Sequence, residues 1–156
     1  MKYFLYTKGS SDNCSAYREG GYAYIIIDEN EKVIKQFSTG TLNSTNNIMA
    51  LKAIIEGCKA IREKGAEVVV FSDNRYAINV LSGFWKASVN KDMVENHKID
   101  QHRLNIQYKW IEKECKNKYN QTVLSLVDFA TDDIRQKHNI NKRISHKLFR
   151  KYYRKG

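Results

Sequence analysis

Residues 67–76 read Glu-Val-Val-Val-Phe-Ser-Asp-Asn-Arg-Tyr, an apolar run that passes directly into polar residues. Short continuous apolar runs are typical of strands at the centre of a parallel sheet, because helices cover both faces of such a strand. Earlier in the chain, two glycines open the apolar segment 20–27, and residues 32–38 return after a turn as the second arm of a hairpin. Together these segments predict one sheet that combines an antiparallel hairpin with parallel strands.

The remaining segments alternate between helix and strand. From Thr45 onward apolar residues recur at helical spacing, and Lys64-Gly65 is a stop signal for that helix. We expect further helices at 75–81, 91–104 and 121–136, and further strands at 2–8 and 106–111. The sequence therefore predicts an α/β protein with a mixed five-stranded sheet, an antiparallel hairpin meander plus parallel strands, flanked by helices.

Length and charge suggest one domain followed by a basic segment. The chain has 156 residues, of which 42% are hydrophobic, and its net charge is +10. Residues 138–156 hold seven Lys or Arg and no Asp or Glu, so we expect a domain at 1–137 and a separate segment at 138–156. Apolar residues recur every four positions in that segment, which predicts an additional amphipathic basic helix. Such a segment suits a polyanion such as nucleic acid, or is a solvated tail that aids solubility.

Several classes of protein are excluded by composition. No apolar run reaches the roughly 20 residues that span a bilayer, so we expect no membrane partner. Residues 1–8 have the pattern of a buried strand and not of a signal peptide. The three cysteines are an odd number without metal-like spacing, which favours reduced thiols and a cytoplasmic location.

Five short motifs follow one another along the chain. They are Tyr6-Thr7-Lys8-Gly9-Ser10, Gly20-Gly21-Tyr22-Ala23, Thr45-Asn46-Asn47-Ile48-Met49-Ala50, Phe71-Ser72-Asp73-Asn74-Arg75-Tyr76 and Lys109-Trp110-Ile111. In order and spacing they resemble the Y-T-D-G-S, G-G-x-G/A, T-N-N-R-M-E, T/S-D-S-x-Y and K-W-V motifs of type 1 ribonucleases H. The resemblance extends over nearly all of residues 3–137 and implies an RNase H-like fold.

The resembled family uses four carboxylates, which hold two divalent ions across the scissile phosphate of the RNA strand. At the first two of these positions this chain has Lys8 and Ala50, whereas Asp73 remains at the third. The fourth depends on alignment. An ungapped alignment from Trp110, which we prefer because it also keeps Asn120 in register, places Leu124 there. A shift of four residues places Asp128 there instead.

A mobile histidine of the family falls on Glu114 in the ungapped alignment. One carboxylate cannot supply the several oxygen ligands that Mg²⁺ requires. The ammonium of Lys8 is expected beside Asp73, where two unit charges about 4 Å apart interact by about 4 kcal/mol at an effective dielectric of 20. We therefore expect Lys8 to replace the metal ions, or alternatively to extend into solvent.

Residues that suit binding of the RNA strand remain. Gly9, Ser10, Asn46 and Asn47 match family positions that contact the 2′-hydroxyls of RNA, and Arg75 adds positive charge beside Asp73. Capping of the helix after Thr45 is the alternative role for the two asparagines.

Aromatic and basic residues elsewhere extend the predicted nucleic-acid surface. Trp85 lies in the place of the family's basic handle, where it either stacks on a sugar or base or anchors the segment to the core. In the C-terminal segment, basic residues alternate with aromatics, as in nucleic-acid contacts, or the helix docks on a protein partner. The basic residues meant here are Lys142, Arg143, Lys147, Arg150, Lys151 and Arg154.

From the substituted carboxylates we predict a catalytically inactive RNase H-like protein that binds RNA/DNA hybrid or structured RNA without a cofactor. One alternative is an interaction or structural subunit of a ribonucleoprotein. The other is an active ribonuclease H that cleaves RNA/DNA hybrids through a rearranged site, with Mg²⁺ or Mn²⁺ as its cofactor.

Overall fold

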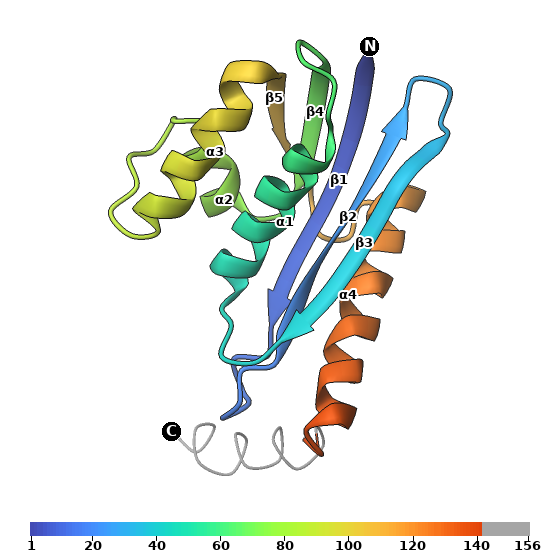
Figure 1. The fold of residues 1–156 in the computed structure, drawn as a ribbon. Coiled ribbons are helices and arrows are strands. Elements are labelled where there is room, and N and C mark those ends of the chain that lie inside the picture. Colours follow the sequence, from blue (N-terminus) through green and yellow to red (C-terminus); the bar gives the residue numbers. More distant parts are fainter. Residues whose placement is uncertain (142–156) are drawn as a thin grey trace.

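Five strands build one mixed sheet in the order β3-β2-β1-β4-β5 (Figure 1) in the computed structural model, which describes residues 1–141. β1 pairs antiparallel with β2 and parallel with β4, and β4 pairs parallel with β5. The predicted combination of a hairpin meander with parallel strands is therefore confirmed. The strands are β1 (Lys2–Ser11), β2 (Gly20–Asp28), β3 (Val33–Thr41), β4 (Glu67–Ser72) and β5 (Asn105–Trp110).

Helices cover the two faces of the sheet unequally. α1, α2 and α3 lie on one face, and α4 lies on the other (Figure 1). α4 begins three residues before the predicted start, because the Asn117 side chain accepts hydrogen bonds from the backbone N–H groups of Tyr119 and Asn120 and caps the helix there. The helices are α1 (Asn46–Ala60), α2 (Arg75–Leu81), α3 (Lys91–Arg103) and α4 (Lys118–Lys137).

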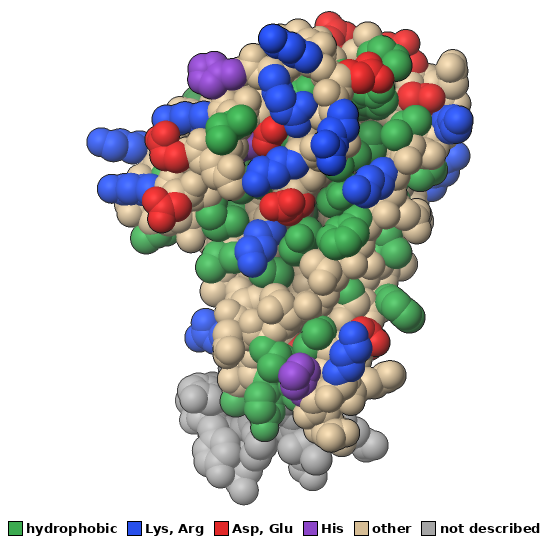
Figure 2. Space-filling view, in the orientation of Figure 1, with side chains coloured by type: hydrophobic (Ala, Val, Ile, Leu, Met, Phe, Trp, Pro, Cys, Tyr) green, Lys and Arg blue, Asp and Glu red, His purple; other side chains and the backbone are tan. Residues whose placement is uncertain are grey.

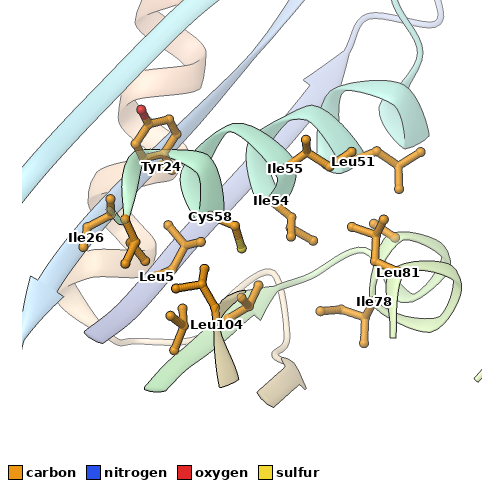
Figure 3. Close-up of a cluster of buried hydrophobic side chains, with 14 of the residues drawn as sticks. Leu5, Tyr24, Ile26, Leu51, Ile54, Ile55, Cys58, Ile78, Leu81 and Leu104 are labelled. Atoms are coloured by element: carbon orange, nitrogen blue, oxygen red, sulfur yellow. The ribbon is translucent and has the colours of Figure 1, made fainter. Parts of the chain in front are cut away.

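Alternation along β1 supplies both cores. Tyr3 and Leu5 face α1, and they meet side chains of α1 and α2 in the larger hydrophobic cluster (Figure 3). Tyr6 faces α4 and packs with Val123 and Val127 of that helix in a smaller cluster. β4, the parallel neighbour of β1, also lies inside the sheet with both faces covered. This position explains why its sequence is a continuous apolar run.

Most of the predicted C-terminal helix lies outside the described residues, and residues 138–141, where the predicted segment starts, are turn and coil. The basic residues of that segment, from Lys142 to Arg154, lie outside the described residues 1–141. The division between residues 137 and 138 therefore stays a prediction. Within residues 1–141, no helix is long and apolar enough to cross a membrane.

A buried ionic cluster ties the end of α4 to the loop between β1 and β2. Arg135 Nε donates to Glu19 Oε1 at 2.9 Å, and the Glu19 side chain is completely buried. The same guanidinium donates to Asp132 at 2.7 Å and to Asp12 at 3.2 Å. Buried carboxylates need such partners to offset their desolvation, so the cluster fixes where α4 ends against the sheet.

A second buried polar group lies between α3 and β5. His97 is fully buried, and its Nε2 lies 2.5 Å from the hydroxyl oxygen of Tyr108. Burial lowers the pKa of His97 to about 4, although the nearby Asp100 acts in the opposite direction. The imidazole is therefore neutral in the folded protein at neutral pH.

We expect acid to destabilise the protein through His97. The unfolded chain takes up the proton near pH 6.5 and the folded chain only near pH 4, so this contribution to stability is complete above about pH 6.5 and is lost as the pH falls toward 4. The loss is on the order of 3 kcal/mol. Urea unfolding at several pH values measures it, and His97→Gln, which cannot be protonated there, should flatten the slope. Equal slopes for both proteins would contradict the assignment.

Candidate active site

A close backbone contact brings the first turns of α1 onto the end of β1. A Cβ placed on Gly9 would lie 2.1 Å from the carbonyl carbon of Met49 and 2.2 Å from the backbone nitrogen of Ala50. Only glycine allows this approach, because any side chain would overlap the helix backbone. Ala50, one of the predicted site positions, is therefore held against β1 next to Lys8.

The parallel pairing of β1 with β4 brings Lys8 to Asp73. Tyr6 is in register with Phe71, and the two rings stack on the α4 side with centroids 4.6 Å apart. Two residues further on, Lys8 Nζ donates to Asp73 Oδ2 at 2.6 Å. Their side chains are only 12% and 9% exposed, so the expected ion pair is present and Lys8 does not extend into solvent.

Asn46 and Asn47 form hydrogen bonds with the residues that surround the Lys8–Asp73 pair, which we call the rim of the site. Asn46 Oδ1 accepts from the backbone N–H of Ser11 at 2.7 Å, and Asn47 Oδ1 accepts from Asn74 at 3.0 Å. The capping alternative for them is wrong, because Thr45 caps α1 by accepting from the Ile48 backbone N–H. Asn46 and Asn47 remain on the surface beside the ion pair.

Arg75 and Trp110 form a stacked pair at the other side of Asp73. The Arg75 guanidinium lies over the Trp110 ring, 3.8 Å from the ring centroid. The indole Nε1 donates to the backbone carbonyl of Asp73 at 3.1 Å. Sequence reasoning named Arg75 but missed Trp110 as a site residue, although its place in the fifth motif, at the end of a parallel strand next to β4, was an available signal.

The two candidates for the fourth carboxylate position lie one helical turn apart on α4. Leu124 is half-buried and Asp128 is exposed. Asp128 lines a cavity of about 460 Å³ with Ser10 and Ser11, beyond Lys8 on β1. Neither candidate has an ionic contact with Lys8 or Asp73 among the interactions of the described residues.

Glu114 lies exposed in the loop between β5 and α4. The buried Asn120 holds this loop, since its Nδ2 donates to the backbone carbonyls of Lys113 at 3.3 Å and Cys115 at 3.4 Å. Asn120 therefore has a structural role that is independent of the alignment of the fourth position.

The segment between α2 and α3 offers exposed aromatic side chains. Phe84 is 79% exposed and Trp85 is 46% exposed, so just over half of the Trp85 surface is covered, and both roles predicted for it, stacking and partial anchoring, stay predictions. On the face that carries α1 and α3, Figure 2 shows basic side chains interspersed with acidic ones. Residues 1–137 hold 20 Lys or Arg against 17 Asp or Glu, a net charge of +3.

Comparisons with known proteins agree with the fold and the motifs. The family model for RNase H matches residues 1–143. Ribonuclease H of Thermoanaerobacter sp. is 31% identical over an alignment that covers 85% of this chain and 89% of the relative. Ribonuclease H of Campylobacter curvus is 38% identical, and the aligned part is 51% of each chain, about half the relative's length.

Solved structures share the architecture at low sequence identity. The N-terminal RNase H domain of a Mycobacterium tuberculosis protein has a TM-score of 0.76 and 19% identity, with 88% of this chain and 98% of that chain covered. LC11-RNase H1 in complex with an RNA/DNA hybrid has a TM-score of 0.67 and 19% identity, with coverages of 85% and 98%. The fold is thus the RNase H-like fold, and the chain belongs to the RNase H family.

These findings overturn the predicted loss of catalysis. The expectation of an inactive hybrid-binding protein rested on Lys8 and Ala50, whereas relatives that are named Ribonuclease H match over 85% of the chain. Physically, a substituted ligand removes one way of holding a metal ion. The Asp73 carboxylate, the Lys8 ammonium and the Arg75 guanidinium remain at the site.

The remaining side chains do not fit the pair of divalent ions that the family resemblance implies. Within residues 1–141, no three His, Cys, Asp or Glu side chains come together in a way that suits a metal ion. Asp73 is the carboxylate at the junction of β1 and β4, and the Lys8 ammonium already binds it. Mg²⁺ requires near-octahedral oxygen coordination, which this donor set does not supply.

The contact at Gly9 makes a direct prediction for stability. Gly9→Ala should lower the free energy of unfolding by about 2 kcal/mol or more, because the added methyl overlaps the backbone of α1. Gly83→Ala is the control. Gly83 has open space around it but a φ of +85°, so its cost should stay near 1 kcal/mol. Urea denaturation of both variants checks the order, and an equal or smaller loss for Gly9→Ala would contradict the close approach.

Proposed function

We propose that this protein is a ribonuclease H, which binds RNA/DNA hybrids and hydrolyses their RNA strand. The observation that carries the proposal is the relation to proteins named Ribonuclease H across 85% of the chain, because it includes the elements that converge at Asp73. The family relative LC11-RNase H1, solved with an RNA/DNA hybrid, supports the class of substrate.

The surface around the ion pair has the chemistry that an RNA strand requires. Exposed amide side chains of Asn46 and Asn47 lie on one side of Asp73, and the exposed Arg75 lies on the other. Amides suit the 2′-hydroxyl groups, which both donate and accept hydrogen bonds, and a guanidinium suits phosphate oxygens. Discrimination of RNA from DNA would therefore be made by α1, and phosphate contact by α2.

Both sets of contacts are positioned before substrate arrives. Asn47 is oriented by its hydrogen bond with Asn74, and the Arg75 guanidinium is stacked on Trp110. Because these side chains are held by neighbours, less conformational entropy is lost on binding. The rim is thus suited to place one phosphate of the RNA strand over the Lys8–Asp73 pair.

Cleavage of a labelled RNA strand tests the proposal. Protein purified from a host without ribonuclease H activity should cut the RNA of an RNA/DNA hybrid but not an RNA duplex. Asp73→Asn should lower the rate by about 100-fold or more, because the amide cannot act as a base. Asp133→Asn, which removes the exposed ion pair with Lys137 on α4, is the matched control and should cleave normally.

Buffers that contain Mg²⁺, Mn²⁺ or EDTA should be compared in the same assay. No cleavage of the hybrid in any of the three would overturn the proposed function. Equal activity of wild-type protein and Asp73→Asn would show that the products came from elsewhere.

A further inference from the structure

The Lys8–Asp73 ion pair lies where the family resemblance leads one to expect metal ligands, yet it is a complete unit. Lys8 Nζ and Asp73 Oδ2 are 2.6 Å apart, and both side chains are nearly buried. One Asp73 oxygen is engaged by the ammonium, and a divalent cation at this carboxylate would meet a positive charge in direct contact. The Lys8–Asp73 pair therefore excludes a divalent cation from the Asp73 carboxylate.

The neighbouring charged groups do not change this balance. On the α4 side, Arg135 is bound by Asp12, Glu19 and Asp132, so these acids are directed at a guanidinium. Asp128 opens onto the cavity that begins at Ser10, and Lys113 lines the same cavity. Arg75 lies next to Asp73 in sequence and brings a second positive charge to its rim.

We propose that Lys8 and Asp73 are an acid–base pair that hydrolyses the RNA strand without a divalent cation. This inference rests on the proposed function and specifies its chemistry. Lys8 has two capacities that a metal ion supplies elsewhere: its positive charge stabilises negative charge on the phosphate, and its ammonium can protonate a leaving oxygen. Arg75 adds hydrogen bonds to the non-bridging phosphate oxygens.

The step balances within the pair. Water adds to phosphorus and gives a proton to the Asp73 carboxylate. The bond between phosphorus and the leaving ribose oxygen breaks with its electron pair on that oxygen, which takes a proton from Lys8. Asp73 is then a carboxylic acid and Lys8 an amine, and one proton passes along their 2.6 Å hydrogen bond to restore both charges.

Calorimetric titration of the full-length protein tests the exclusion of metal without reference to activity. Mg²⁺ and Mn²⁺ should give no stoichiometric binding to wild-type protein, and Lys8→Asp should gain binding because it replaces the ammonium with a second carboxylate beside Asp73. Stoichiometric binding to wild-type protein that Asp73→Asn removes would overturn the proposal.

Cleavage assays with three lysine variants test the role of the ammonium. Wild-type protein should cut the hybrid at the same rate in EDTA and in Mg²⁺. Lys8→Met should lose about 100-fold or more. Lys8→Arg keeps the charge but cannot give up its proton, so it should bind hybrid normally and lose cleavage to a similar extent. Lys137→Met, on the exposed pair with Asp133, should be unaffected.

The outcomes separate the two proposals. Cleavage that requires Mg²⁺ or Mn²⁺ would overturn the acid–base pair and leave the proposed function standing. Full activity of Lys8→Arg would overturn the acid role of Lys8. Absence of cleavage under every condition would overturn both proposals, and thermal melts of each variant establish whether lost activity reflects lost folding.

Discussion

The site depends on the contact between the backbone of α1 and Gly9 of β1. A helix normally stands off from a sheet by the length of its side chains, but here the missing Cβ lets the peptide of Met49 and Ala50 reach the strand itself. That approach sets the distance of α1 from the sheet, and with it the position of Asn46 and Asn47 beside the Lys8–Asp73 pair. The neighbouring residue, Lys8, faces the opposite side of the sheet and meets Asp73. The end of β1 thus brings the asparagines of α1 next to the Lys8–Asp73 pair.

Most of the fold could be predicted because its signals are local. The apolar run of β4 and the helical period after Thr45 predict their elements within a few residues, and the order of elements predicts the topology of the sheet. Ends of helices were less predictable, since the start of α4 depends on how the Asn117 side chain caps it. The ionic cluster at Arg135 was not predicted at all. It joins residues more than 100 positions apart, and a charged residue near a helix end gives no sequence signal that it is buried.

The meeting of Lys8 with Asp73 could be predicted from the sequence, but the activity inferred from the substituted carboxylates was wrong. The motifs correctly predicted that Lys8 would meet Asp73, because parallel neighbouring strands bring residues after the same register point together. Stacking of Arg75 on Trp110 was not foreseen, since it depends on how far β5 extends beside β4. Loss of catalysis was inferred by counting carboxylates against a family pattern. That count is blind to what the substituted residue itself can do, and the kinship of the chain to ribonucleases H along its length weighs against it.

Trp110 is one of only two tryptophans in the chain, and both of the contacts described for it are with residues of the site. Its ring lies beneath the Arg75 guanidinium, and its N–H bonds the carbonyl of Asp73. Indole emission responds to nearby charge and to hydrogen bonding of the ring nitrogen. Trp110 is therefore an intrinsic fluorescence probe that contacts the backbone of Asp73 directly. Replacing Trp85 with phenylalanine would leave Trp110 as the single tryptophan, whose emission, excited apart from the tyrosines, follows the arrival of a phosphate at Arg75 without any added label.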